Sequence, residues 1–161
     1  MRVSKLKSRR LLARLLERAR KQGKSIVFTN GCFDLLHPGH IRLLNFAKKQ
    51  GDLLVVALNS DRSVRALKGV AHPIQSEKDR AELICALEAV DYVTFFGEKD
   101  PGRLIRALRP DVLIKGADWK KEEVIGGPFV ESYGGKVLAF PRVGGKSTTS
   151  LIQKIRRLKR S

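Results

Sequence analysis

The sequence predicts a single α/β domain with a doubly wound, Rossmann-like sheet of five parallel strands. Five short runs are apolar and rich in β-branched residues, as buried strands are. Segments with apolar residues at helical spacing separate these runs, and no repeat or low-complexity segment interrupts the alternation. Continuous apolar strands joined by helices are typical of a parallel sheet covered on both faces. Ligands of such domains bind beyond the carboxyl ends of the strands.

Each element follows from local pattern. The expected strands are Ile26–Thr29, Leu53–Leu58, Tyr92–Phe95, Val112–Lys115 and Val137–Phe140. The helices expected between them are Pro38–Gln50, Ser60–Leu67, Ser76–Ala89, Pro101–Leu108 and Glu122–Tyr133. Ser60 and Ser76 are typical helix N-caps. Two basic helices are expected at the ends, Lys5–Gln22 and Ser147–Leu158, and the apolar residues of the last one are expected to pack on the sheet, namely Leu151, Ile152, Ile155 and Leu158.

The composition favours a small cytoplasmic enzyme. A chain of 161 residues is long enough for one domain, 1–161, that buries a core without disulfides or metal. Cys32 and Cys85 have neither a disulfide framework nor zinc spacing, which fits a reducing compartment. The sequence contains no apolar run long enough to cross a bilayer and no apolar signal-peptide core.

The formal net charge of +17 is concentrated at the two ends of the chain. Residues 1–24 contain ten Lys or Arg and one Glu, residues 136–161 contain eight and no acid, and residues 25–135 are neutral. A basic excess is typical of nucleic-acid binders, so a nucleic-acid-binding module is the alternative from another class. Only Phe140 could stack a base in either end, which favours a solvated basic surface; an anionic lipid surface is a third reading. No specific nucleic-acid or membrane partner is therefore expected.

The run from Thr29 to His40 predicts a phosphate site. It joins an apolar strand to a helix that Pro38 can open, and the N–H groups of a first helical turn attract anions. His37 and His40 are three residues apart, so they project from the same side of that turn. Gly39 between them allows a close approach of the backbone to a ligand. Paired imidazoles can stabilise the charge that develops in phosphoryl or nucleotidyl transfer.

This run resembles the G-x-F-D-x-x-H-x-G-H signature of the cytidylyltransferase-like nucleotidyltransferases, an HxGH type of α/β fold. The variant Thr-Asn-Gly-Cys-Phe-Asp is similar to the heptose 1-phosphate adenylyltransferases of that family. The resemblance extends from about Gly23 to Leu158 and includes Asn59-Ser60-Asp61, Leu67-Lys68-Gly69, Asp79-Arg80, Ala86 to Asp91, Lys115 to Trp119 and Ser147-Thr148-Thr149.

The resemblance implies which residues form the site. It assigns catalysis to His37, His40, Lys68 and Arg142. It assigns nucleotide binding to Asn30, Gly31, Cys32, Phe33, Gly39, Asp118, Ser147, Thr148 and Thr149.

Several of these residues have a plainer reading. Lys68 is equally well read as a surface lysine, Trp119 as a core residue and Ser147 as an N-cap. His72 stands where relatives usually have Arg.

Residues 144–149 predict a second phosphate cradle at the start of the last helix, because two glycines and three hydroxyls meet there. Residues 142–149 are similar to the R-x-x-G-x-S-T-T element of glycerol 3-phosphate cytidylyltransferases, with Arg142, Ser147, Thr148 and Thr149 as the matching residues. A Walker A motif is excluded because Phe140 occupies the position of its first glycine.

The resemblance implies transfer of AMP from ATP to a sugar 1-phosphate, D-glycero-β-D-manno-heptose 1-phosphate, giving ADP-heptose and pyrophosphate for lipopolysaccharide core synthesis. Mg²⁺ is expected with ATP, held through phosphates and water rather than by a carboxylate cage. The alternatives are a cytidylyltransferase for glycerol or another polyol phosphate, and a flavin adenylyltransferase. A homodimer and a separate sugar kinase upstream are the expected partners.

Overall fold

The computed structural model describes residues 4–116, 123–141 and 147–158. Its sheet has five parallel strands in the order β3-β2-β1-β4-β5, as the sequence predicts. The strands are β1 (Ile26–Gly31), β2 (Leu53–Asn59), β3 (Tyr92–Phe96), β4 (Val112–Gly116) and β5 (Lys136–Phe140). Each expected strand is confirmed to within two residues, and β1 is central.

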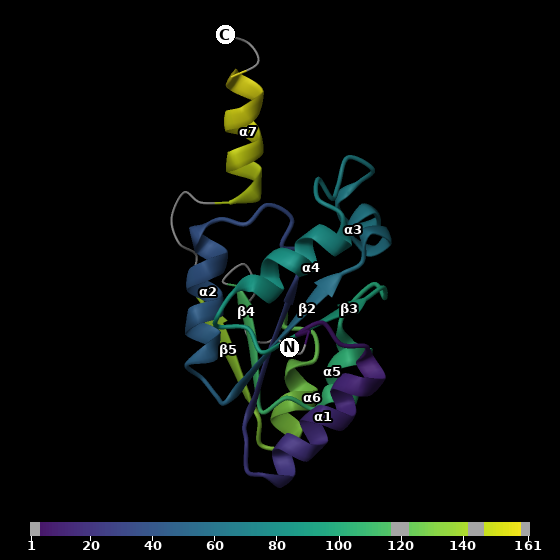
Figure 1. Cartoon of the computed structure of the whole chain (residues 1–161), viewed down its shortest axis with the longest axis vertical. Coiled ribbons are helices and arrows are strands. Elements are labelled where there is room, and N and C mark those ends of the chain that lie inside the picture. Colours follow the sequence, from purple (N-terminus) through teal and green to yellow (C-terminus); the bar gives the residue numbers. More distant parts are fainter. Residues whose placement is uncertain (1–3, 117–122, 142–146, 159–161) are drawn as a thin grey trace.

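The helices are α1 (Arg9–Lys21), α2 (Pro38–Lys48), α3 (Asp61–Lys68), α4 (Glu77–Ala86), α5 (Gly102–Leu108), α6 (Gly127–Ser132) and α7 (Thr148–Leu158). Five of them cover the two faces of the sheet, α1, α5 and α6 on one face and α2 and α4 on the other (Figure 1). One core cluster joins the sheet to α1, α5 and α6, and a second joins its other face to α2 and α4. Among the described residues, no helix is both long and apolar enough to cross a bilayer.

Local caps explain where the helices begin. Ser60 and Ser76 each accept a hydrogen bond from the backbone N–H three residues later, which confirms both as N-caps. The N-terminal helix was expected from Lys5, but it begins at Arg9 behind the N-cap Ser8. Residues 5–7 are extended instead and hydrogen-bond to Val93 on the edge strand β3. Pairing with the sheet satisfies backbone groups that a longer helix would have used.

The helix expected over Glu122–Tyr133 is shorter than predicted, because α6 begins only at Gly127. Gly126 has a φ of +86°, a left-handed conformation that interrupts a right-handed helix. Pro128 in the first turn then suits a helix start and not a helix interior.

The prediction that the apolar residues of α7 pack on the sheet is wrong. No residue of α7 is buried, and Leu151, Ile155 and Leu158 are exposed. Figure 1 shows the reason, since α7, the yellow helix, extends away from the body and both faces of the sheet are already covered by other helices.

Candidate functional site

A cavity of about 840 Å³ lies at the carboxyl ends of all five strands. Residues at or next to these ends line it, and they include Gly31, Asn59, Phe96, Gly116 and Phe140. The chain passes from β1 to β2 and β3 on one side and returns to β4 on the other side of β1. This reversal is the topological switch point at which ligands of open parallel sheets bind.

The motif loop, residues 32–37, joins β1 to α2 and brings both histidines to the cavity. His37 is the N-cap of α2, and its Nδ1 accepts the backbone N–H of Gly39 at 3.1 Å. The Nδ1 atom of His40 accepts the backbone N–H of His37 at 3.3 Å. The two imidazoles stack with ring centroids 3.9 Å apart. The expected placement on one side of the first turn is therefore confirmed.

These hydrogen bonds determine the tautomer of both rings. A nitrogen that accepts a hydrogen bond cannot carry a proton, so each neutral imidazole has its proton on Nε2. Burial, together with the nearby His37 and Lys68, lowers the pKa of His40 to about 4. Burial also lowers the pKa of His37. At neutral pH, the cavity thus has two uncharged Nε2–H donors side by side.

The imidazole of His40 is expected to titrate near pH 4 instead of its ordinary 6.5. Between these values the unfolded chain binds the additional proton, so this group's contribution to the free energy of unfolding is present above about pH 6.5 and is lost as the pH falls toward 4. Imidazole NMR signals recorded against pH measure the midpoint, with His40→Ala to assign the signal. A midpoint near 6.5 would contradict the assigned environment.

The start of α7 also contributes to the wall of the cavity. Ser147 and Thr148 line it, whereas Thr149 is exposed and lies outside the lining. The Ser147 hydroxyl accepts the backbone N–H of Ser150 at 3.0 Å, so Ser147 caps the helix. The Thr148 hydroxyl donates to the carbonyl of Leu35 at 3.3 Å, which ties α7 to the motif loop. Two helix N-termini therefore border the same cavity, an arrangement that favours anions.

Lysines add positive charge to the cavity. Lys68, at the end of α3, is exposed but lines the cavity and is near enough to His40 to lower its pKa. Lys115, on β4, also lines the cavity, and burial lowers its pKa. Lys99 comes from the loop after β3. Three segments of the chain therefore place lysines at the cavity, where they can attract a polyphosphate.

Cys32 also lines the cavity, and its Sγ donates to Oδ1 of Asn59 at 3.8 Å. Burial raises the pKa of Cys32, which keeps the thiol protonated and unreactive as a nucleophile. Asn59 in turn donates to Ser63 at 2.9 Å.

Of the residues assigned from the resemblance, the structure brings together at this cavity Asn30, Gly31, Cys32, Phe33, His37, Gly39, His40, Lys68, Ser147 and Thr148. Their binding and catalytic roles stay predictions. Asp118, Trp119 and Arg142 lie outside the described residues.

Four further lining residues were given no site role from the sequence: Asn59 and Lys115 were quoted only as parts of family matches, and Phe96 and Lys99 were not singled out. The signal for them was available, because each lies at or shortly after the carboxyl end of a predicted strand.

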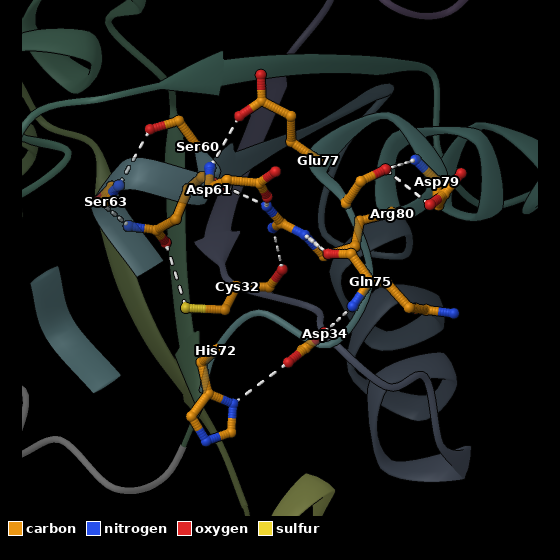
Figure 2. A network of polar contacts seen from close by, with 12 residues as sticks. Cys32, Asp34, Ser60, Asp61, Ser63, His72, Gln75, Glu77, Asp79 and Arg80 are labelled. Atoms are coloured by element: carbon orange, nitrogen blue, oxygen red, sulfur yellow. Dashed lines mark hydrogen bonds and ion pairs between the residues drawn. The ribbon is translucent and has the colours of Figure 1, made fainter. Parts of the chain in front are cut away.

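The acid of the motif, Asp34, has a supporting position. It is 2 % exposed, and its carboxylate accepts the backbone N–H groups of Ile74 and Gln75 at 2.9 Å. His72 approaches the same carboxylate, with Nδ1 3.5 Å from Oδ2 (Figure 2). The chain therefore places an imidazole beside a buried carboxylate.

Comparison with known proteins shows which family the sequence resembles. A family model described as cytidylyltransferase-like matches residues 28–139. "Bifunctional protein HldE" of Syntrophotalea carbinolica is 51 % identical over 152 residues, which are 94 % of this chain and 31 % of that protein. The protein of the same name from Gluconobacter oxydans is 52 % identical over 141 residues, 88 % of this chain and 29 % of that protein. The chain spans about a third of the length of these relatives.

Two solved structures are similar. The lipopolysaccharide core biosynthesis protein from Thermoplasma volcanium GSS1 is 32 % identical, covers 75 % of this chain and 98 % of its own, and has a TM-score of 0.62. The pantoate-beta-alanine ligase from Francisella tularensis covers 99 % of this chain and 80 % of its own at 16 % identity and a TM-score of 0.60, so it supports the fold alone.

Proposed function

This chain belongs to the cytidylyltransferase-like family, and from that premise we propose that it transfers AMP from ATP to D-glycero-β-D-manno-heptose 1-phosphate. The products are ADP-heptose and pyrophosphate, and the proposed role is in lipopolysaccharide core synthesis. Support for the acceptor comes from relatives named HldE that are about half identical to this chain and from the name of the similar Thermoplasma protein.

The stacked pair of His37 and His40 is the observation that carries the proposed chemistry. Both rings are held by backbone N–H groups through Nδ1, so their orientation is fixed before a substrate binds. Fixed Nε2–H donors can stabilise negative charge on a transferring phosphate, because no free energy is needed to reorient them during the reaction.

The proposed reaction is a direct in-line displacement. A phosphate oxygen of the sugar 1-phosphate attacks the α-phosphorus of ATP, and the bond from that phosphorus to the oxygen bridging to the β-phosphorus breaks. Pyrophosphate leaves with the electron pair of that bond. His37 and His40 would hold the transferring phosphate, and Lys68 and the α7 start with Thr148 would hold the leaving pyrophosphate. The high pKa of Cys32 fits a mechanism without a covalent enzyme intermediate.

Mg²⁺ is proposed to accompany ATP. The described residues contain no group of three or more His, Cys, Asp or Glu side chains that could hold a metal. The ion would therefore be held mainly by phosphate oxygens and water, as is usual for Mg²⁺ at nucleotide sites, and would supply charge neutralisation there. Asp100 lines the cavity, and its Oδ1 accepts the backbone N–H of Gly102 at 2.8 Å, so Oδ2 is the oxygen that could face such a hydrated ion.

Pyrophosphate release is expected with ATP and heptose 1-phosphate but not with CTP. The decisive assay pairs ATP or CTP with the phosphates of heptose, glycerol and flavin and measures pyrophosphate. Release from CTP with glycerol 3-phosphate would identify a polyol cytidylyltransferase, and release from ATP with the flavin phosphate a flavin adenylyltransferase. If ATP with heptose 1-phosphate released no pyrophosphate, the result would contradict the proposed function.

The proposed acceptor also defines the preceding reaction. A sugar 1-phosphate has to be formed by an enzyme that phosphorylates the anomeric position, so a sugar kinase is the proposed upstream partner. A homodimer and a cytoplasmic location stay predictions, and sedimentation of the purified chain measures the first.

A further inference from the structure

A fully buried cation lies beneath the cavity. Arg80, on α4, is 0 % exposed and is not a lining residue. Its guanidinium donates to four acceptors, of which Figure 2 labels Cys32, Asp61 and Gln75. They are the carbonyls of Cys32 at 2.6 Å, Asn59 at 2.9 Å and Gln75 at 3.2 Å, and the carboxylate of Asp61 at 2.8 Å.

These acceptors come from three segments that are distant in the sequence. Cys32 belongs to the motif loop, Asn59 ends β2, and Gln75 lies in the 72–75 segment before α4. Burying a charge is costly unless hydrogen bonds satisfy it, and the planar fork of an arginine can meet several fixed acceptors at once. Arg80 is therefore suited to fix the relative positions of these segments.

The bond to Cys32 acts on the conformation of the motif loop. In a planar trans peptide the C=O and the next N–H point in opposite directions, so the N–H of Phe33 points away from Arg80. Phe33 itself has a φ of +48°, which is uncommon for a residue with a side chain. Such a conformation persists only where the surroundings hold it, and the bond from Arg80 to the preceding carbonyl is one such restraint.

Asp34 of the motif loop provides a second link between that loop and the 72–75 segment. Gln75 donates its backbone N–H to Asp34 and accepts from Arg80 through its carbonyl. Two buried charged groups thus join the 72–75 segment to the motif loop, Asp34 of the loop itself and Arg80 of α4. His37 begins α2 only three residues after Asp34, so a shift of the loop displaces the imidazoles.

We infer that Arg80 is a positioning residue for nucleotidyl transfer, acting through the backbone of the motif loop and of Gln75 without touching substrate. This inference rests on the proposed function for its kinetic test. Small displacements of a catalytic group are expensive, because a misplacement of about 1 Å costs on the order of 10²-fold in rate. Loss of the Arg80 side chain should therefore lower kcat more than it raises the KM for ATP.

The test compares Arg80→Lys, Arg80→Met and the control Arg103→Lys, which alters an exposed arginine on α5. Circular dichroism first defines conditions in which each variant is folded. Arg80→Lys is expected to lower kcat roughly 10–100-fold with less than about a threefold change in KM. Arg80→Met is expected to lower kcat further than Arg80→Lys does, because methionine has neither the charge nor the hydrogen-bond donors that lysine partly keeps. Wild-type kcat in folded Arg80→Lys would overturn the inference.

A second readout does not depend on turnover. The imidazole NMR signals of His37 and His40 should move in Arg80→Lys and stay unchanged in Arg103→Lys. If the wild type releases no pyrophosphate, the proposed function fails, and these signals alone decide the positioning role. If Arg80→Lys does not fold, Asp61→Asn replaces it, since that variant weakens the ion pair at 2.8 Å. Unchanged signals and kcat in Asp61→Asn would then overturn the inference.

Discussion

Turnover is expected to fall about 10²–10³-fold in His40→Ala and in His37→Ala, the typical loss for one donor that stabilises a developing oxyanion. Each substitution removes one of the two Nε2–H donors that the structure holds at the cavity. Pyrophosphate release under saturating ATP and heptose 1-phosphate measures kcat. The fall should appear in kcat more than in the KM for ATP, because the donors act on charge that develops during transfer.

The position of His37 at a helix start requires a separate control. His37→Ala also removes the N-cap of α2, and loss of a cap costs about 0.5–2 kcal/mol of stability. His37→Ser keeps a capping oxygen and lacks the imidazole, so it should regain stability without regaining turnover. Near-normal turnover in folded His37→Ser or His40→Ala would show that the imidazoles have no role in the transfer.

The free energy of unfolding is expected to fall by about 3–5 kcal/mol in Phe28→Ala. Phe28 is 0 % exposed on the central strand β1, where it packs in the core cluster that joins the sheet to α1, α5 and α6. The substitution removes the transfer energy of the ring and leaves a cavity that the close-packed interior cannot fill. Chemical denaturation followed by circular dichroism measures the change. Because small domains are stable by about 5–15 kcal/mol, the variant should be close to unfolding at physiological temperature.

Leu83→Ala is the matched control, because Leu83 is 40 % exposed on α4. A surface substitution of this kind should change stability by less than about 0.5 kcal/mol. Equal effects of the two substitutions would mean that the cluster around Phe28 does not hold the sheet.

The strands and the order of elements could be predicted from the sequence because their signals are local. A buried parallel strand is a short apolar run, and each of the five runs is found as a strand. Local signals disagree in the helix expected from Glu122. Its apolar residues have helical spacing, but Gly126 and Pro128 favour a helix start, and the helix begins only at Gly127. For α7 the pattern predicted the helix but not its neighbours, because an apolar stripe does not say what it packs on.

Some residues of the candidate site could likewise be predicted from local sequence, and others could not. His37 and His40 were predictable because a strand, a turn and a helix start follow one another along the chain. Arg80 was only one residue of a family match, and nothing in its local sequence marks it as buried. Its partner Cys32 is 48 positions away, so the contact exists only after β1 and α4 have packed on each other. Long-range charge networks leave no local pattern to read.

The extended segment at the N-terminus has a consequence for solubility. The N–H of Lys7 and the carbonyl of Lys5 both bond to Val93, so this stretch covers part of the outer edge of β3. An uncovered edge strand exposes unpaired backbone N–H and C=O groups that can pair with a strand of another molecule and cause aggregation. A covering segment that contains lysines is one of the features that prevent such pairing. Deleting the first seven residues would therefore expose a template for strand addition, on the side of the sheet farthest from β5.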